Sequence, residues 1–312
     1  MDELLVGLAA VLCFLFGWNN SSFLIGNLRG AGSLSFAWAI VLSVAGLLVG
    51  ALLEGPKMAS TLAGTLSPST TTTILLAVLV VSVVFSLALT LLDLPVSFSM
   101  IMVSAFLGAT YASALPIAAG RSWEVVGFWF LAPLATALIT FGVYDFTTSF
   151  VSRYGILTVD ALNRAGAVVS GLAVSYTLGA NNIGLFYAGT GVFAAATPVD
   201  FSVVLVLLLA GTVGIVALGR TALGGTMGDK MLTLSPQGVF SAFVSSSIIV
   251  WVGTQFGLPV SISQCLLGGM LGAAFSRVVS AVNTKLVNET IAMWVTAPLV
   301  AFIASYLLVG VL

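Results

Sequence analysis

Long apolar runs, separated by short stretches rich in polar residues, glycine and proline, make up most of the chain. The runs 74–92 and 201–218 contain no charged residue. A helix of about 20 apolar residues crosses a hydrocarbon layer of about 30 Å, so these runs predict transmembrane helices. We expect an all-α integral membrane protein with eight to ten full spans, in which the remaining apolar helices cover approximately residues 4–28, 33–53, 125–144, 161–196, 239–256 and 289–312.

Several of the polar interruptions occur twice and in the same order. Residues 94–99 read LPVSFS and residues 258–263 read LPVSIS, an offset of 164 residues (258 minus 94). Residues 17–20 read GWNN and residues 179–182 read GANN at nearly the same offset. The pairs predict two internal transmembrane repeats within one membrane domain, residues 1–150 and 151–312. Short polar interruptions that recur within the apolar segments of two repeats indicate the substrate site of a secondary transporter.

Each repeat is expected to contain one broken helix and one re-entrant helical hairpin. Residues 17–22 and 179–184 are predicted to interrupt their helices, because clustered amides and hydroxyls in lipid need a cavity or other protein as partner. Small residues punctuate the segment 95–120, which favours a hairpin with Gly108 near its tip, although two short full spans are the alternative. A linker over 145–160 and a polar loop over 219–238 are also expected.

If the two breaks and the two hairpin starts meet in mid-membrane, they form a polar site without formal charge. Helix N-termini contribute partial positive charge and unpaired N–H groups, which favour a small oxyanion. Asn carbonyls and freed backbone carbonyls would suit a monovalent cation. Packing between membrane helices is the competing interpretation for any one of these small polar residues. The expected anion-binding residues are Ser21, Ser22, Ser97, Ser99, Ser261, Ser263 and Gln264, and the expected cation-binding or lining residues are Asn19, Asn20, Asn181 and Asn182.

Composition narrows the class of protein. Of the 312 residues, 60% are hydrophobic and 6% are charged, and the mean hydropathy is +1.20, whereas about 25% of residues are charged in soluble domains. The nine basic residues are scattered singly and the net charge is −1, so no nucleic-acid surface is expected.

The residues that usually carry catalysis or bind metals are scarce. The chain has no His and two isolated Cys, Cys13 and Cys265, both inside apolar segments. The usual acid, base and metal ligand are therefore missing, and two such thiols are poor evidence for a disulfide or metal site. We expect no enzymatic activity, no metal and no cofactor, apart from Na+ or H+ as a coupling ion.

The repeated motifs resemble those of the inorganic phosphate transporter (PiT, or phosphate permease) family. Its GANDVANAFG-like motif is similar to residues 17–22 and 179–184, and its PVSTTH-like motif to residues 95–100 and 259–264. Its TKLTPxQGF-like loop is similar to residues 232–240. The resemblance implies inverted repeats and a homodimer in the cell membrane that moves inorganic phosphate with Na+ or protons. It also implies that motif aspartates serve the cation and hairpin Ser and Thr the anion.

The chain departs from that pattern at the positions of the motif aspartates and histidines. The aspartate positions hold Asn20 and Asn182, and the histidine positions hold Met100 and Gln264. Loss of both carboxylates weakens the local attraction for Na+ and removes repulsion against a dianion. Inorganic phosphate is the first expectation for the substrate. Sulfate or a related oxyanion, and an uncoupled anion channel or sensor, are the alternatives.

Overall fold

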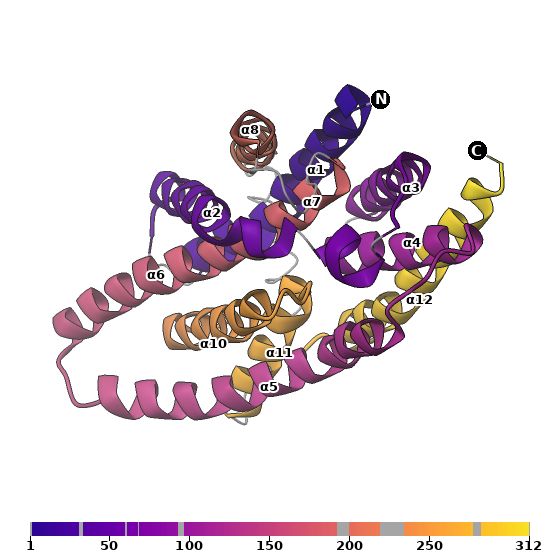
Figure 1. Ribbon diagram of the computed structural model, residues 1–312. Helices are drawn as coiled ribbons and strands as arrows, with labels where there is room; N and C mark the ends of the chain where they lie inside the picture. The colour runs from indigo at the N-terminus through magenta and orange to yellow at the C-terminus, as the bar shows by residue number, and fades with distance from the viewer. Residues whose placement is uncertain are drawn as a thin grey trace.

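The computed structural model is a bundle of helices (Figure 1). It describes residues 2–30, 34–59, 61–67, 69–92, 97–191, 200–218, 234–276 and 282–311. No strand occurs among these residues. The α-helices are α1 (Asp2–Gly30), α2 (Phe36–Ala59), α3 (Thr72–Leu91), α4 (Phe98–Ala112), α5 (Ala119–Val151), α6 (Ile156–Leu178), α7 (Gly184–Gly189), α8 (Phe201–Leu218), α10 (Pro236–Gln255), α11 (Ile262–Phe275) and α12 (Thr284–Val309), and the π-helical turns are η1 (Thr61–Leu66) and η2 (Gly179–Ile183).

Seven helical segments in the described ranges are long and apolar enough to cross a bilayer, which makes the chain a multi-pass membrane protein. They are α1, α2, α3, α5, the continuous unit α6–η2–α7, α10 and α12. The apolar helices α4, α8 and α11 are shorter. Within the described ranges, helix length therefore supports seven full spans rather than the expected eight to ten.

The linker between the two halves is shorter than the sequence indicates. α5 continues to Val151 and α6 begins at Ile156, so most of the predicted linker 145–160 is helical. In Figure 1 these two long helices diverge from their connection, and α10 packs between them against both. The division of the chain into residues 1–150 and 151–312 stays a prediction.

The two repeats exchange helix partners. α1 packs against α8 while α2 packs against α6, and α4 packs against α12 while α11 packs against α5. In the sequence repeat α4 corresponds to α11 and α5 to α12. The contact of α4 with α12 is therefore equivalent to the contact of α11 with α5. The core is thus built between the repeats as well as inside each one, where α3 packs against α4 and α10 against α11.

Two glycines allow the short helices to lie close to their partners. A Cβ at Gly108 would lie 2.1 Å from the carbonyl oxygen of Phe302 in α12, and one at Gly272 would lie 2.3 Å from that of Ala137 in α5. Both distances are far below van der Waals contact, so the two positions require glycine. Gly108 is therefore a helix-packing residue within α4, and its predicted place at the tip of a hairpin is wrong.

Hydroxyl residues fix the starts of α10 and α11. Ser235 precedes Pro236, the first helical residue of α10, and its Oγ accepts a hydrogen bond from the backbone N–H of Gly238 at 3.2 Å. Ser261 precedes α11 and its Oγ accepts from the N–H of Gln264 at 3.3 Å. Each cap satisfies one of the N–H groups that a helix start leaves unpaired. Most of the predicted polar loop 219–238 lies outside the described residues.

Candidate functional site

The amides and hydroxyls of the first motif lie on an uninterrupted helix. The Nδ2 of Asn20 donates to the carbonyl of Phe16 at 3.0 Å, and the Oγ of Ser21 donates to that of Trp18 at 2.6 Å. Both side chains are buried and use their own helix as partner, so α1 needs no break. The predicted interruption at 17–22 is therefore wrong, and the side chain of Ser22 lies outside the described part of the chain.

In the second motif the helix does change its winding. Residues 179–183 form the π-helical turn η2 between α6 and α7. Such single turns are frequent at functional sites because the wider winding redirects side chains. The predicted break at 179–184 thus takes the form of a local widening, and the chain continues in the same direction.

The first Asn of each pair makes an equivalent bond to the helix that precedes a hairpin motif. The Nδ2 of Asn19 donates to the Oγ1 of Thr90 near the end of α3 at 3.3 Å, and that of Asn181 donates to the Oγ1 of Thr254 near the end of α10 at 3.0 Å. Our sequence reading missed both threonines. Their spacing of 164 residues, which equals that of the LPVS motifs, is the signal that would have found them.

The two neighbouring amides of η2 have different environments. Asn181 is fully buried, donates also to the carbonyl of Leu258 at 3.0 Å and accepts from the N–H of Val260 at 3.0 Å. Asn182 is also buried, yet its Nδ2 finds no hydrogen-bond partner within the described structure. Asn181 therefore ties η2 to the second hairpin motif, while Asn182 keeps an unused donor.

The start of α4 reaches the other repeat. Ser99 donates through Oγ to the carbonyl of Val260 at 3.0 Å. Ser97 precedes the helix, makes no capping bond, and its buried Oγ is without a partner in the part of the chain described. The two LPVS motifs therefore touch each other, although residues 93–96 themselves lie outside the described ranges.

The start of α11 carries a compact group of polar side chains. Ser261 and Ser263 share a hydrogen bond between their Oγ atoms at 3.1 Å, and Ser261 also caps the helix. The Oε1 of Gln264 is buried and has no hydrogen-bond partner among the described atoms. A donor, a hydroxyl and an acceptor thus stand unused at Asn182, Ser97 and Gln264.

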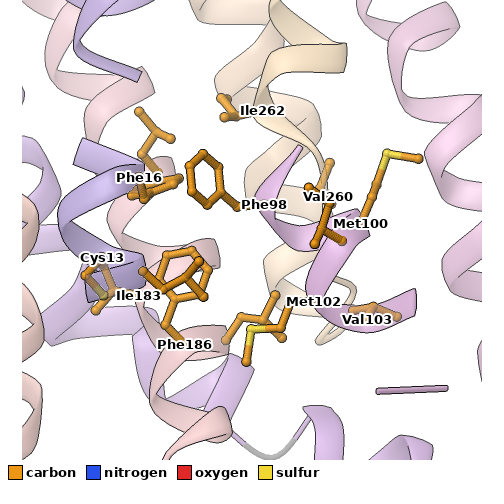
Figure 2. Packing of buried hydrophobic residues seen from close by; sticks show 14 of the residues in the cluster. Cys13, Phe16, Phe98, Met100, Met102, Val103, Ile183, Phe186, Val260 and Ile262 are labelled. Carbon is orange, nitrogen blue, oxygen red and sulfur yellow. The ribbon is translucent and has the colours of Figure 1, made fainter. Parts of the chain in front are cut away.

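Aromatic rings connect the motifs on their apolar side. Phe98, which stands between Ser97 and Ser99, meets Phe16 of α1 edge to face at 5.4 Å between ring centroids. Phe186 of α7 lies 5.3 Å from the Phe16 ring and 6.3 Å from that of Phe98. Figure 2 shows Phe98 between Phe16 and Ile262, the residue at the position equivalent to Phe98 in the second repeat. We call Phe16, Phe98 and Phe186 the aromatic cluster.

The four motif pieces are therefore gathered in one region and closed to solvent. Hydrogen bonds join η2 to the second hairpin motif and the two hairpin motifs to each other, and the aromatic cluster joins α1 and α7 to α4. All of the predicted site residues with described side chains are uncharged, and all except the half-buried Asn19 are buried. Among the described residues, the predicted polar site is therefore shielded from solvent.

A cavity of about 140 Å³ adjoins the second motif but does not expose its amides. Its wall includes Ile183 and Gly184 just after Asn182, together with Tyr187 of α7 and apolar residues of α2 and α8. Because this lining is largely apolar, the cavity lacks the donors that an oxyanion needs. The polar atoms at Asn182, Ser97 and Gln264 remain the better candidates.

Comparison with known sequences gives a consistent result. A sequence model of the phosphate transporter family matches residues 16–163 and, a second time, residues 158–305. A protein of Methanocaldococcus jannaschii named as a phosphate permease is 23% identical over 300 residues, which cover 95% of this chain and 93% of that protein. The sulfate permease of Bacillus subtilis is 26% identical over 325 residues, covering 97% of this chain and 87% of its own length.

A solved structure shares the fold. The structure described as the sodium-dependent phosphate transporter aligns with a TM-score of 0.85 and covers 99% of this chain and 98% of its own. The sequence identity is 16%, so the agreement concerns the arrangement of helices.

Proposed function

Because the chain belongs to the phosphate transporter family, we propose that it is a secondary transporter that carries inorganic phosphate across the cell membrane, coupled to Na+ or H+. The family match covers both repeats and nearly the whole chain. Its members are transporters rather than enzymes, which agrees with the scarcity of catalytic residue types in the sequence.

The observation that carries the proposal is the set of unused polar atoms at the repeated motifs. A buried polar group without a partner costs about 1–3 kcal/mol, and such groups in native structures call for an explanation. The Nδ2 of Asn182 and the Oγ of Ser97 can donate to anion oxygens, and the Oε1 of Gln264 can accept a proton that phosphate still carries. We infer that a phosphate bound among the repeated motifs would use these atoms.

The electrostatics of the region favour an anion of low charge. Ser97 and Ser261 occupy the N-cap positions of α4 and α11, and a helix N-terminus offers partial positive charge. The neutral amides at positions 20 and 182 do not repel the incoming anion. Hydrogen bonds and helix ends would therefore hold phosphate here without a basic side chain.

Occlusion by the aromatic cluster fits a step of a transport cycle. The rings of Phe16, Phe98 and Phe186 are buried, and they stand on the elements that carry the two Asn motifs and the first Ser motif. Separation of these elements would open a path for the anion. Alternating access by rocking of one repeat against the other around a fixed site would provide that separation.

Sulfate is the second candidate substrate, and one feature of the site favours it. Sulfate is fully ionised at neutral pH and needs donors only, and both motif aspartates of the resembling family are replaced here by Asn20 and Asn182. The sulfate permease of Bacillus subtilis also aligns over 97% of this chain. Gln264 distinguishes the two substrates. Its unused Oε1 can accept a hydrogen bond from phosphate, which still carries a proton, but not from sulfate, which carries none.

Uptake into proteoliposomes tests the function. Purified protein is expected to accumulate labelled phosphate against its gradient when a Na+ or pH difference is imposed, with unlabelled phosphate competing better than sulfate. Asn182→Leu should abolish most of the flux, whereas Trp123→Phe, at an exposed position of α5, should leave it unchanged. Flux that only equilibrates would indicate an uncoupled channel, and absence of phosphate flux together with sulfate uptake would replace phosphate by sulfate.

We further propose that the transporter works as a homodimer. Large apolar side chains are exposed along α5 and α12, among them Leu134, Leu138 and Leu299, and such a surface suits either lipid or a second copy. Cross-linking in native membranes, followed by mass determination in detergent, distinguishes the two. A monomer in both measurements would contradict the dimer without affecting the transport proposal.

A further inference from the structure

The segment that leads into α11 is held by side chains over its whole length. Each of the five consecutive carbonyl oxygens from Phe256 to Val260 accepts a hydrogen bond from a side chain of another element. The donors, in the order of these carbonyls, are Arg121, Thr61 at 3.2 Å, Asn181 at 3.0 Å, Trp129 at 2.8 Å and Ser99 at 3.0 Å.

The backbone N–H groups of this segment are also engaged. Leu258 donates to the carbonyl of Gly253 at 2.8 Å, and Val260 donates to the Oδ1 of Asn181 at 3.0 Å. Gly257 has a φ of +61°, which glycine adopts without strain, and Pro259 has no N–H. Phe256 and Gly257 therefore form a turn that closes α10, and the residues after them belong to no regular helix or sheet and depend on their partners.

Most of the donors come from the other repeat. Thr61 lies in η1, Ser99 in α4, and Arg121 and Trp129 in α5, all before residue 150. Thr61, Ser99, Trp129 and Asn181 are buried. Hydrogen bonds in such surroundings are costly to lose, because the carbonyl left behind has no access to water.

We propose that Trp129, Asn181 and Ser99 are positioning residues that hold residues 258–260 and thereby fix the start of α11, while Asn182, Gln264 and Ser97 contact the anion. This division rests on the proposed function and follows from which polar atoms are already used. The polar atoms of Asn181 and the Oγ of Ser99 are committed to the segment. Atoms of the other three residues remain unused among the described residues. Asn181 and Ser99 are thus no longer expected to contact the ligand, and Trp129, which the sequence did not single out, is assigned a positioning role.

Hydrogen–deuterium exchange of peptides covering residues 258–264 tests the positioning role without any substrate. Trp129→Phe keeps a ring of similar shape but removes the N–H, and Ser99→Ala removes the hydroxyl. Both variants should exchange about tenfold faster than the unmodified protein at the start of α11. Ser99→Thr, which keeps the hydroxyl, should restore slow exchange, and Trp123→Phe on the same helix as Trp129 should change nothing.

Transport kinetics test the division between positioning and contact. Trp129→Phe and Ser99→Ala should raise KM by a similar factor for phosphate and for sulfate, because a displaced helix start weakens both anions alike. Gln264→Met should instead change the ratio of the two KM values, since it removes an acceptor that protonated phosphate can use and sulfate cannot.

The outcomes separate this inference from the proposed function. Unchanged exchange in both Trp129→Phe and Ser99→Ala would overturn the positioning role, as would a change in anion preference in those variants. If the unmodified protein carries neither anion, the transport proposal fails while the exchange result still decides the role of Trp129. If Trp129→Phe does not fold, the pair Ser99→Ala and Ser99→Thr decides alone.

Discussion

Asn181 donates a hydrogen bond to Thr254 at 3.0 Å, and this contact ties the π-helical turn η2 to the end of α10. The equivalent bond of the first repeat joins Asn19 to Thr90 at 3.3 Å. In each half the Asn motif is therefore anchored to the helix that precedes a Ser motif. Movement of one motif should be transmitted to the other through this bond.

Thr254→Val is expected to destabilise the protein by about 1 kcal/mol, because it removes the hydroxyl that accepts from Asn181 while nearly conserving shape. Denaturant titration of the protein in detergent measures the change in the free energy of unfolding. Thr296→Val is the matched control, since that exposed hydroxyl bonds mainly within α12, and it should stay within about 0.5 kcal/mol of the unmodified protein. Equal effects of the two substitutions would contradict an anchoring role.

Gly108→Ala is expected to cost about 1–3 kcal/mol and to lower the yield of folded protein, because a Cβ would meet the Phe302 carbonyl at 2.1 Å and force α4 away from α12. Gly142→Ala in α5, where a Cβ meets no atom within 4 Å, should be neutral or stabilising, since Ala is the better helix former. Thermal unfolding of both variants provides the comparison. A tolerated Gly108→Ala would mean that the α4–α12 contact is looser than described.

The repeated motifs and the helical class could be predicted from the sequence, because both depend on residue patterns within short segments of the chain. Ser261 stands at the start of a helix as its residue type suggests, and the apolar runs became helices. The continuity of α1 through residues 17–22 could not be predicted, because it depends on Asn20 satisfying its amide on the Phe16 carbonyl of its own helix. In the sequence, a polar side chain that hydrogen-bonds to the preceding turn of its own helix cannot be distinguished from one that faces a cavity.

Gly108 and Asn181 show a second limit of sequence reasoning. Glycine serves turns and close helix contacts equally well, and only the position of Phe302 decides between them. Asn181 forms its bonds with residues 73 to 123 positions away, so its role depends on tertiary contacts that one sequence does not reveal. The sequence identifies which residues matter here, and the packing decides which of them remain free.

The aromatic cluster should behave as a coupled unit. Edge-to-face pairs contribute about 0.5–1.5 kcal/mol beyond their buried area, so Phe16→Leu and Phe98→Leu combined should cost less than the two single changes added together. A double-mutant cycle of unfolding free energies measures this coupling. Phe16→Leu with Phe106→Leu, a buried ring in the middle of α4, is the control pair and should be additive. Additivity of Phe16 and Phe98 would show that the rings are merely neighbours.

Asn182→Asp should make the stability of the protein depend on Na+. The amide of Asn182 is buried, and the predicted site residues that the structure describes include no charged group. An unpaired carboxylate at this position would therefore lower the stability of the folded protein by several kcal/mol. A bound cation would offset that cost, so the variant should unfold at a lower temperature in choline chloride and recover in sodium chloride, and its gain from Na+ should exceed that of the unmodified protein. The added charge should also repel dianions and reduce the uptake of sulfate more than that of phosphate. If Na+ stabilises the unmodified protein as strongly as the variant, the neutral amides already bind the cation and a carboxylate at this position is not what coupling requires.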